Sequence, residues 1–95
     1  MKTTITAGTR FRGAEDVVFT AVENEAVLLH LTSKRYYGLN ETGTRIWQLV
    51  QVGASVAEMA TALSDEYDAT HEEATQAVID LCCELLEESL ILAAE

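Results

Sequence analysis

The chain has 95 residues, of which 48% are hydrophobic, and it carries two cysteines and a formal net charge of −10. This length suits one domain with a single hydrophobic core, and the hydrophobic content excludes a disordered chain. No apolar run approaches the roughly 20 residues that span a bilayer, and the first residues lack the apolar segment of a secretion signal. We therefore expect a cytoplasmic domain without a membrane partner.

The charges are divided unevenly along the chain. All six basic residues lie at or before Arg45, whereas the segment from Ile46 onward contains eleven acidic residues and no Lys or Arg. The C-terminal half is therefore expected to repel phosphate backbones, which disfavours nucleic acid as a partner.

The two ends of the chain carry the weakest structural signals. Residues 1–16 show no clear periodicity, so we expect a partly ordered arm ahead of a domain formed by residues 17–95. At the other end, Leu90-Ile91-Leu92 is apolar. This short run leaves two alternatives, an additional strand or a cap on the core.

Three strands are predicted first. They are residues 17–22, 26–31 and 36–39, which are rich in β-branched, aromatic and other apolar residues. Short polar segments join them, as the turns of hairpins require, although none contains the Asn-Gly pair of the commonest hairpin turn. This order predicts an antiparallel meander whose last strand lies at an edge of the sheet.

Three helices are expected after the strands. Asn40 is placed to cap the first helix, at about residues 41–51, and Gly53 to end it in the left-handed conformation. Ser55-Val56-Ala57-Glu58 and Thr70-His71-Glu72-Glu73 are capping boxes that open the second and third helices. The sequence therefore predicts an α+β fold in which a three-stranded antiparallel sheet is followed by three helices.

The third helix has more apolar surface than a single packing contact needs. Its apolar residues form two neighbouring stripes, Ala74, Val78, Leu81 and Leu85 and, beside them, Ile79, Cys82 and Leu86. One interpretation is that one side packs on the helices and the other on the sheet. The other is that part of this surface lines a ligand groove beside the third strand. The residues alone leave both open.

The adjacent Cys82 and Cys83 fall in this helix, where successive side chains point about 100° apart and cannot form an ordinary disulfide. No histidine lies at ligand spacing from them, which argues against a zinc site. We expect both cysteines to act as small hydrophobic residues of the core or the groove, and we expect no metal or other cofactor.

No constellation of residues supports catalysis. A Gly-rich phosphate loop, a nucleophile elbow and a metal-binding histidine pattern are all missing from the sequence, and His30 and His71 are expected to be structural. Three helices beside a small sheet are also the elements of a winged helix-turn-helix. Residues 72–88, however, contain six acidic residues, no basic residue and only Gln76 to read bases. We expect neither an enzyme nor a DNA-binding regulator, and keep both as rivals.

The third strand points to a different function. An exposed edge strand binds an extended peptide through its unpaired N–H and C=O groups. Tyr36 and Tyr37 suit the walls of such a site, and Gly38 permits close approach of a backbone. Lys34 and Arg35 predict attraction to acidic residues of the peptide. The alternative is that the two tyrosines only close the core, and composition leaves both interpretations open.

Several motifs of the chain occur together in one known family. They are Tyr37-Gly38-Leu39-Asn40-Glu41-Thr42-Gly43-Thr44-Arg45-Ile46-Trp47, Gly53, Ser55-Val56-Ala57-Glu58, Ala62-Leu63, Tyr67 and Leu86-Glu87-Glu88-Ser89-Leu90-Ile91. From Val17 to Leu92 the chain resembles the PqqD-like family, the precursor-peptide recognition elements of pathways that make ribosomally synthesised, post-translationally modified peptides (RiPPs). Ser89 departs from the pattern, because the family often has Gly there.

The resemblance implies a winged helix-turn-helix-like fold and a non-catalytic adaptor. The leader of a precursor peptide would add as a strand to the third strand and pack against the third helix. Carried over by position, the peptide-binding residues are Lys34, Arg35, Tyr36, Tyr37, Gly38 and Leu39 on the strand and Val78, Leu81, Cys82 and Leu85 on the helix.

The chain is similar to the discrete recognition proteins of lasso-peptide pathways, which present the leader to a leader peptidase. The alternative within the family is a PqqD-type peptide chaperone for a radical SAM enzyme in cofactor synthesis. Both imply a precursor leader peptide and a modifying enzyme as partners.

Overall fold

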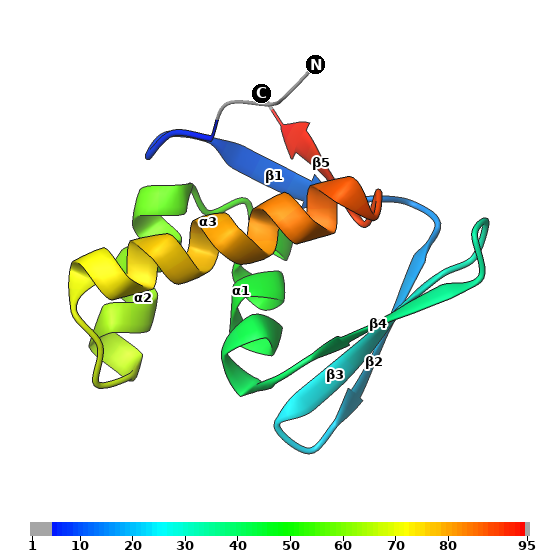
Figure 1. Cartoon of the computed structure of the whole chain (residues 1–95), viewed down its shortest axis with the longest axis horizontal. Coiled ribbons are helices and arrows are strands. Elements are labelled where there is room, and N and C mark those ends of the chain that lie inside the picture. The colour runs from blue at the N-terminus through cyan, green and yellow to red at the C-terminus, as the bar shows by residue number, and fades with distance from the viewer. Residues whose placement is uncertain (1–4, 95) are drawn as a thin grey trace.

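The computed structural model describes residues 5–94, so residues 1–4 of the expected arm and the last residue lie outside the described part. Strands and helices follow one another as shown in Figure 1. Their bounds are β1 Arg10–Gly13, β2 Val17–Val22, β3 Glu25–His30, β4 Arg35–Leu39, α1 Glu41–Gln51, α2 Val56–Glu66, α3 His71–Glu87 and β5 Ile91–Ala94.

The predicted meander is present. Strands β2, β3 and β4 pair antiparallel in the order β2-β3-β4. In its register Phe19 lies opposite Leu28, and Leu28 lies opposite Tyr37. All three side chains therefore share the face that is turned toward the helices. The α+β fold, with a three-stranded antiparallel sheet followed by three helices, is confirmed.

A second, two-stranded sheet joins the two ends of the described chain. β1 pairs antiparallel with β5, and Phe11 of β1 is buried together with Leu90 and Ile91. The C-terminal apolar run thus both adds a strand and fills the core. Phe11, which lies in the expected arm, also belongs to the core. The sequence did not predict this, because the arm shows no clear periodicity.

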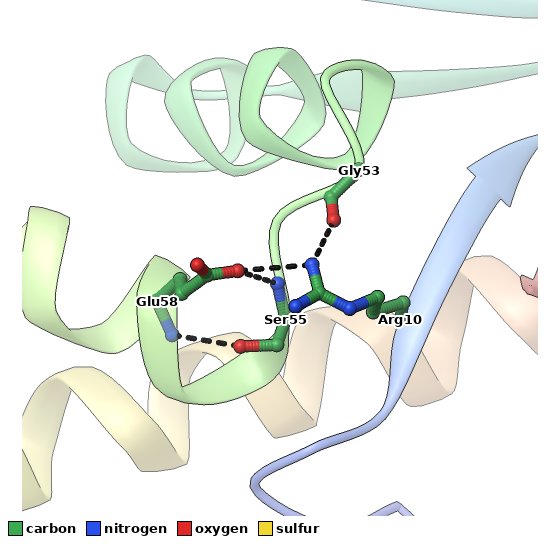
Figure 2. Close-up of polar contacts among 4 residues, drawn as sticks. All are labelled: Arg10, Gly53, Ser55 and Glu58. Atoms are coloured by element: carbon green, nitrogen blue, oxygen red, sulfur yellow. Dashed lines mark hydrogen bonds and ion pairs between the residues drawn. The ribbon is translucent and has the colours of Figure 1, made fainter. Parts of the chain in front are cut away.

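Arg10 fastens β1 to the start of α2 (Figure 2). Its guanidinium donates to the carbonyl of Gly53 and to the carboxylate of Glu58, where Nη1 and Oε1 are 3.0 Å apart. The same carboxylate accepts from the Ser55 N–H, and the Glu58 N–H donates to the Ser55 hydroxyl, so the predicted capping box is confirmed. These contacts with Ser55 and Arg10 lower the pKa of Glu58.

The other predicted helix starts are confirmed as well. The Asn40 side chain caps α1, and Thr70 and Glu73 form a capping box on α3. The core fills the space between the helices and the sheet, and the rings of Phe19 and Trp47 stack at 6.5 Å between centroids. Within residues 5–94, no helix is both long enough and apolar enough to cross a membrane.

The C-terminal ends of α1 and α3 share one geometry but use different residues. In each, the N–H groups of the two residues beyond the cap donate to carbonyls of the last turn, which is the Schellman motif. The motif places one residue in the left-handed region, Gly53 with φ 81° after α1 and Ser89 with φ 59° after α3. Ser89 therefore carries strain that glycine avoids.

Exchanging these two residue types tests this strain. Ser89→Gly should raise the free energy of unfolding by about 0.5–1 kcal/mol, because the relief of strain exceeds the added entropy of the unfolded chain. Gly53→Ser should lower it by about 1 kcal/mol. Ser89→Ala keeps the Cβ atom, and with it the backbone strain at positive φ, so it serves as the control in urea denaturation. A Ser89→Ala variant as stable as Ser89→Gly would show that φ is not the cause.

Candidate peptide-binding site

β4 has one paired edge and one open edge. It pairs with β3 from Arg35 to Leu39, and none of the described strands pairs with its other side. In an antiparallel ladder, alternate residues direct their N–H and C=O groups to opposite sides. The open edge therefore presents unpaired backbone donors and acceptors, which can template a further strand.

A groove of about 370 Å³ lies between β4, the start of α1 and α3. Its lining residues are Tyr37, Gly38, Leu39, Asn40, Thr42, Gly43 and Ile46 on one side and Ala77, Asp80, Leu81 and Glu84 of α3 on the other. No residue of β3 lines the groove, so it lies on the open side of β4.

The junction between β4 and α1 is tight. Leu39 is buried, and the side-chain oxygen of Asn40 accepts a hydrogen bond of 2.8 Å from the N–H of Gly43. A Cβ atom on Gly43 would lie 3.2 Å from Leu39 Cδ2 and 3.3 Å from Asn40 Oδ1. Glycine thus permits the close approach of the strand end to the first turn, which fixes β4 relative to the helices.

Three of the four residues predicted on α3 do not face the groove. Val78, Cys82 and Leu85 have 0% of their surface exposed and lie in the core. Their predicted role in peptide contact is therefore corrected to a packing role. Leu81 is partly exposed and lines the groove, and its contact with a peptide stays a prediction.

Seven lining residues were not predicted as peptide-binding residues. Four belong to the start of α1 and its cap, Asn40, Thr42, Gly43 and Ile46, and three belong to α3, Ala77, Asp80 and Glu84. Ala77, Asp80, Leu81 and Glu84 are spaced three or four residues from one turn to the next, so they lie along one side of α3. Two of them are acidic, and by composition they resemble a solvated helix face. The helical spacing of these residues was visible in the sequence, but only the position of β4 identifies this side of α3 as the wall of a groove.

The predicted strand residues alternate between two faces of the sheet. Tyr37 and Leu39 are turned toward the helices, whereas Tyr36 lies on the outer face and is 74% exposed. Tyr37 is partly buried beside α3. Burial raises the pKa of its phenol, and the carboxylates of Glu84 and Glu88 raise it further. Tyr36 therefore does not close the core, and Tyr37 forms one wall of the groove.

The charged residues of β4 and of the groove have opposite signs. Arg35 Nε lies 3.4 Å from Glu88 Oε1, so this cation pairs with the end of α3. Lys34 is exposed in the turn before β4, with φ 65°. The charged side chains that line the groove itself are Asp80 and Glu84. The lining is thus acidic, and an attraction of Lys34 and Arg35 to an acidic peptide stays untested.

The two thiols differ in environment. Both are free, with Cys82 buried and Cys83 exposed, so the expectation of a core or groove position is wrong for Cys83. Burial raises the pKa of the Cys82 thiol to about 12, which makes it unreactive. In residues 5–94, no group of three or more His, Cys, Asp or Glu side chains is arranged to hold a metal ion.

Alanine substitutions test which side of α3 faces the groove. Leu85→Ala should lower the free energy of unfolding by about 2–5 kcal/mol, because it opens a cavity in the core. Leu81→Ala should cost about 1 kcal/mol or less, since its side chain is only partly buried. Urea denaturation measures both values. Equal losses at the two positions would contradict the assignment of the faces.

The chain superimposes on TbiB1 in complex with the TbiA(beta) leader peptide with a TM-score of 0.82 and 28% identity, covering 88% of this chain and 98% of that one. Lasso peptide synthetase B1 complexed with the leader peptide gives a TM-score of 0.81 and 29% identity, covering 87% and 98%. No curated protein sequence matches the chain significantly.

The family assignment rests on the sequence itself. Residues 25–91, well over half of the chain, match the family described as coenzyme PQQ synthesis protein D (PqqD). The matched segment begins with β3 and ends with the first residue of β5, so it includes β4, the three helices and the whole groove. The chain therefore belongs to the PqqD family.

Proposed function

We propose that this protein binds the leader of a ribosomally made precursor peptide as an added strand on β4 and presents it to a processing enzyme, such as a leader peptidase in lasso-peptide biosynthesis. The observation that carries the proposal is the open edge of β4 beside the groove that α3 walls. Both similar structures are described as complexes with a leader peptide, which supports the same ligand class here.

β4 is favoured over the other edge of the same sheet. β2 also has an open edge, but none of its residues lines the groove between β4 and α3. A strand added to β2 would gain backbone hydrogen bonds alone. A strand added to β4 would in addition place alternate side chains against Leu81 and Ile46, and this supplies the selectivity that backbone pairing lacks.

The proposed role is that of an adaptor. An open strand edge beside a groove accounts for peptide binding without any chemical step by this chain. Binding by strand addition also holds a peptide extended, which suits delivery to the active site of another protein. Because the precursor is made on ribosomes, the proposal places the protein in the cytoplasm.

The family match supports a second candidate, a PqqD-type chaperone for a radical SAM enzyme. The leader-binding step is the same in both, and the two differ only in the enzyme that receives the peptide. We favour the lasso-peptide role because one of the two superimposed structures, which is 29% identical to this chain, is lasso peptide synthetase B1 complexed with the leader peptide.

Fluorescence polarisation tests the proposal. A fluorescein-labelled synthetic leader, encoded by the precursor gene beside this one, should bind saturably with a dissociation constant in the micromolar range or below. Adding the protein should also accelerate cleavage of the precursor by the pathway's leader peptidase. Absence of saturable binding would contradict the proposal. Binding without faster cleavage would remove the presentation step and leave the recognition step.

Variants of β4 and α3 locate the site. Gly38→Pro removes one N–H from β4, whereas Gly38→Ala keeps it and places a Cβ with no atom within 4 Å. Proline should weaken leader binding about tenfold relative to alanine, the value of roughly one hydrogen bond. Ala77→Trp should also weaken binding, because it fills the groove from an exposed position without changing β4. Folded variants, checked by thermal unfolding, that bind unchanged would show that the site lies elsewhere.

A further inference from the structure

The groove carries negative charge that the protein itself does not neutralise. Asp80 and Glu84 line it one helical turn apart, and both are exposed. Among residues 5–94, the three ion pairs join Arg10 to Glu58, Arg35 to Glu88 and Arg45 to Glu66, so neither groove carboxylate has a cationic partner. Asp80 Oδ1 accepts a hydrogen bond of 2.7 Å from Gln76 Nε2, which is a neutral group.

The acidic positions lie within reach of a strand on β4. The Arg35–Glu88 pair brings the start of β4 to the C-terminal end of α3, and Tyr37 lies beside Glu84. β4 therefore passes α3 from Glu88 toward Asp80. Asp80 and Glu84 are four residues apart, so they are separated by a rise of roughly 6 Å along α3. This is no more than the about 6.6 Å between successive inward side chains of a strand, so one inward position of an added strand can lie level with the pair and its side chain can reach both carboxylates.

The apolar part of the groove lies next to its acidic part. Leu39 and Ile46 line it from the sheet and α1, and Leu81 lines it from α3. An added strand that directs alternate residues into the groove meets both parts. Its inward side chains would need two chemistries, apolar at one position and charged at another.

We propose that the peptide bound in this groove carries a Lys or Arg that faces Asp80 and Glu84, with an apolar residue at the neighbouring inward position, two residues away. This rests on the proposed function and names the chemical class of leader that the site selects. A leader with an acidic residue at that position would bring a third carboxylate beside two others and would be rejected. The selected partner is therefore a basic leader segment. This differs from the acidic peptide that Lys34 and Arg35, at the start of β4, suggested from the sequence.

Charge complementarity of this kind contributes specificity more than affinity, because the carboxylates are exposed to solvent. Neutralising both, with Asp80→Asn and Glu84→Gln, keeps the size of the side chains and the acceptor for Gln76. The double variant should bind the labelled leader about three- to tenfold more weakly at low salt. At about 0.5 M salt the difference from wild type should become small, because ions screen exposed charges.

A matched variant and a set of altered leaders complete the experiment. Asp65→Asn makes the same change of charge at an exposed position of α2 that does not line the groove, and it should bind like wild type. In the leader, each Lys or Arg is replaced in turn by Gln. One replacement should weaken binding to wild type by the same three- to tenfold, but should have little effect on the double variant.

Two outcomes would overturn the inference, and they are distinguishable from failure of the proposed function. If the unaltered leader binds but no Lys or Arg replacement is coupled to Asp80 and Glu84, the charge selection is wrong and leader binding stands. If neutralising the two carboxylates strengthens binding, the groove selects an acidic peptide instead. If wild type binds no leader at any salt concentration, the proposed function falls and the inference falls with it.

Discussion

The position of β4 depends on its one-residue connection to α1. β4 ends at Leu39, α1 begins at Glu41, and Asn40 between them caps the helix through the Gly43 N–H. With no loop to absorb movement, burial of Leu39 and the capped first turn hold the open edge at one place relative to the helices. The short junction thus keeps the open edge of β4 beside α3, where the groove lies between them.

The opposite wall is held by separate contacts. α3 packs against α2 and β5, and β5 pairs with β1, which Arg10 ties to the start of α2 through Gly53 and Glu58 (Figures 1 and 2). The residues of β1 therefore support the groove without lining it. Substitutions in this region are expected to act on peptide binding through the position of α3, since Phe11 of β1 is buried in the same core.

The sequence predicted those features that depend on local chemistry. Capping residues at Asn40 and Ser55 mark helix starts, because few other residues satisfy the free N–H groups of a first turn. β1 was missed because its four residues form a strand only by pairing with β5, which lies about 80 positions away in the sequence. The groove side of α3 was also hidden: the apolar surface of α3 is wide, and burial of Val78, Cys82 and Leu85 depends on where α2 and β5 pack.

Amide hydrogen exchange, with and without the leader peptide, tests strand addition on β4 most directly. The account predicts slower exchange at Tyr36 and Gly38, because the N–H groups of these two residues face the open edge of β4 whereas the residues between and beside them pair with β3. Amides of β2 should be unchanged. Saturating leader that slows exchange on β2, or leaves every amide of β4 unchanged, would contradict the account.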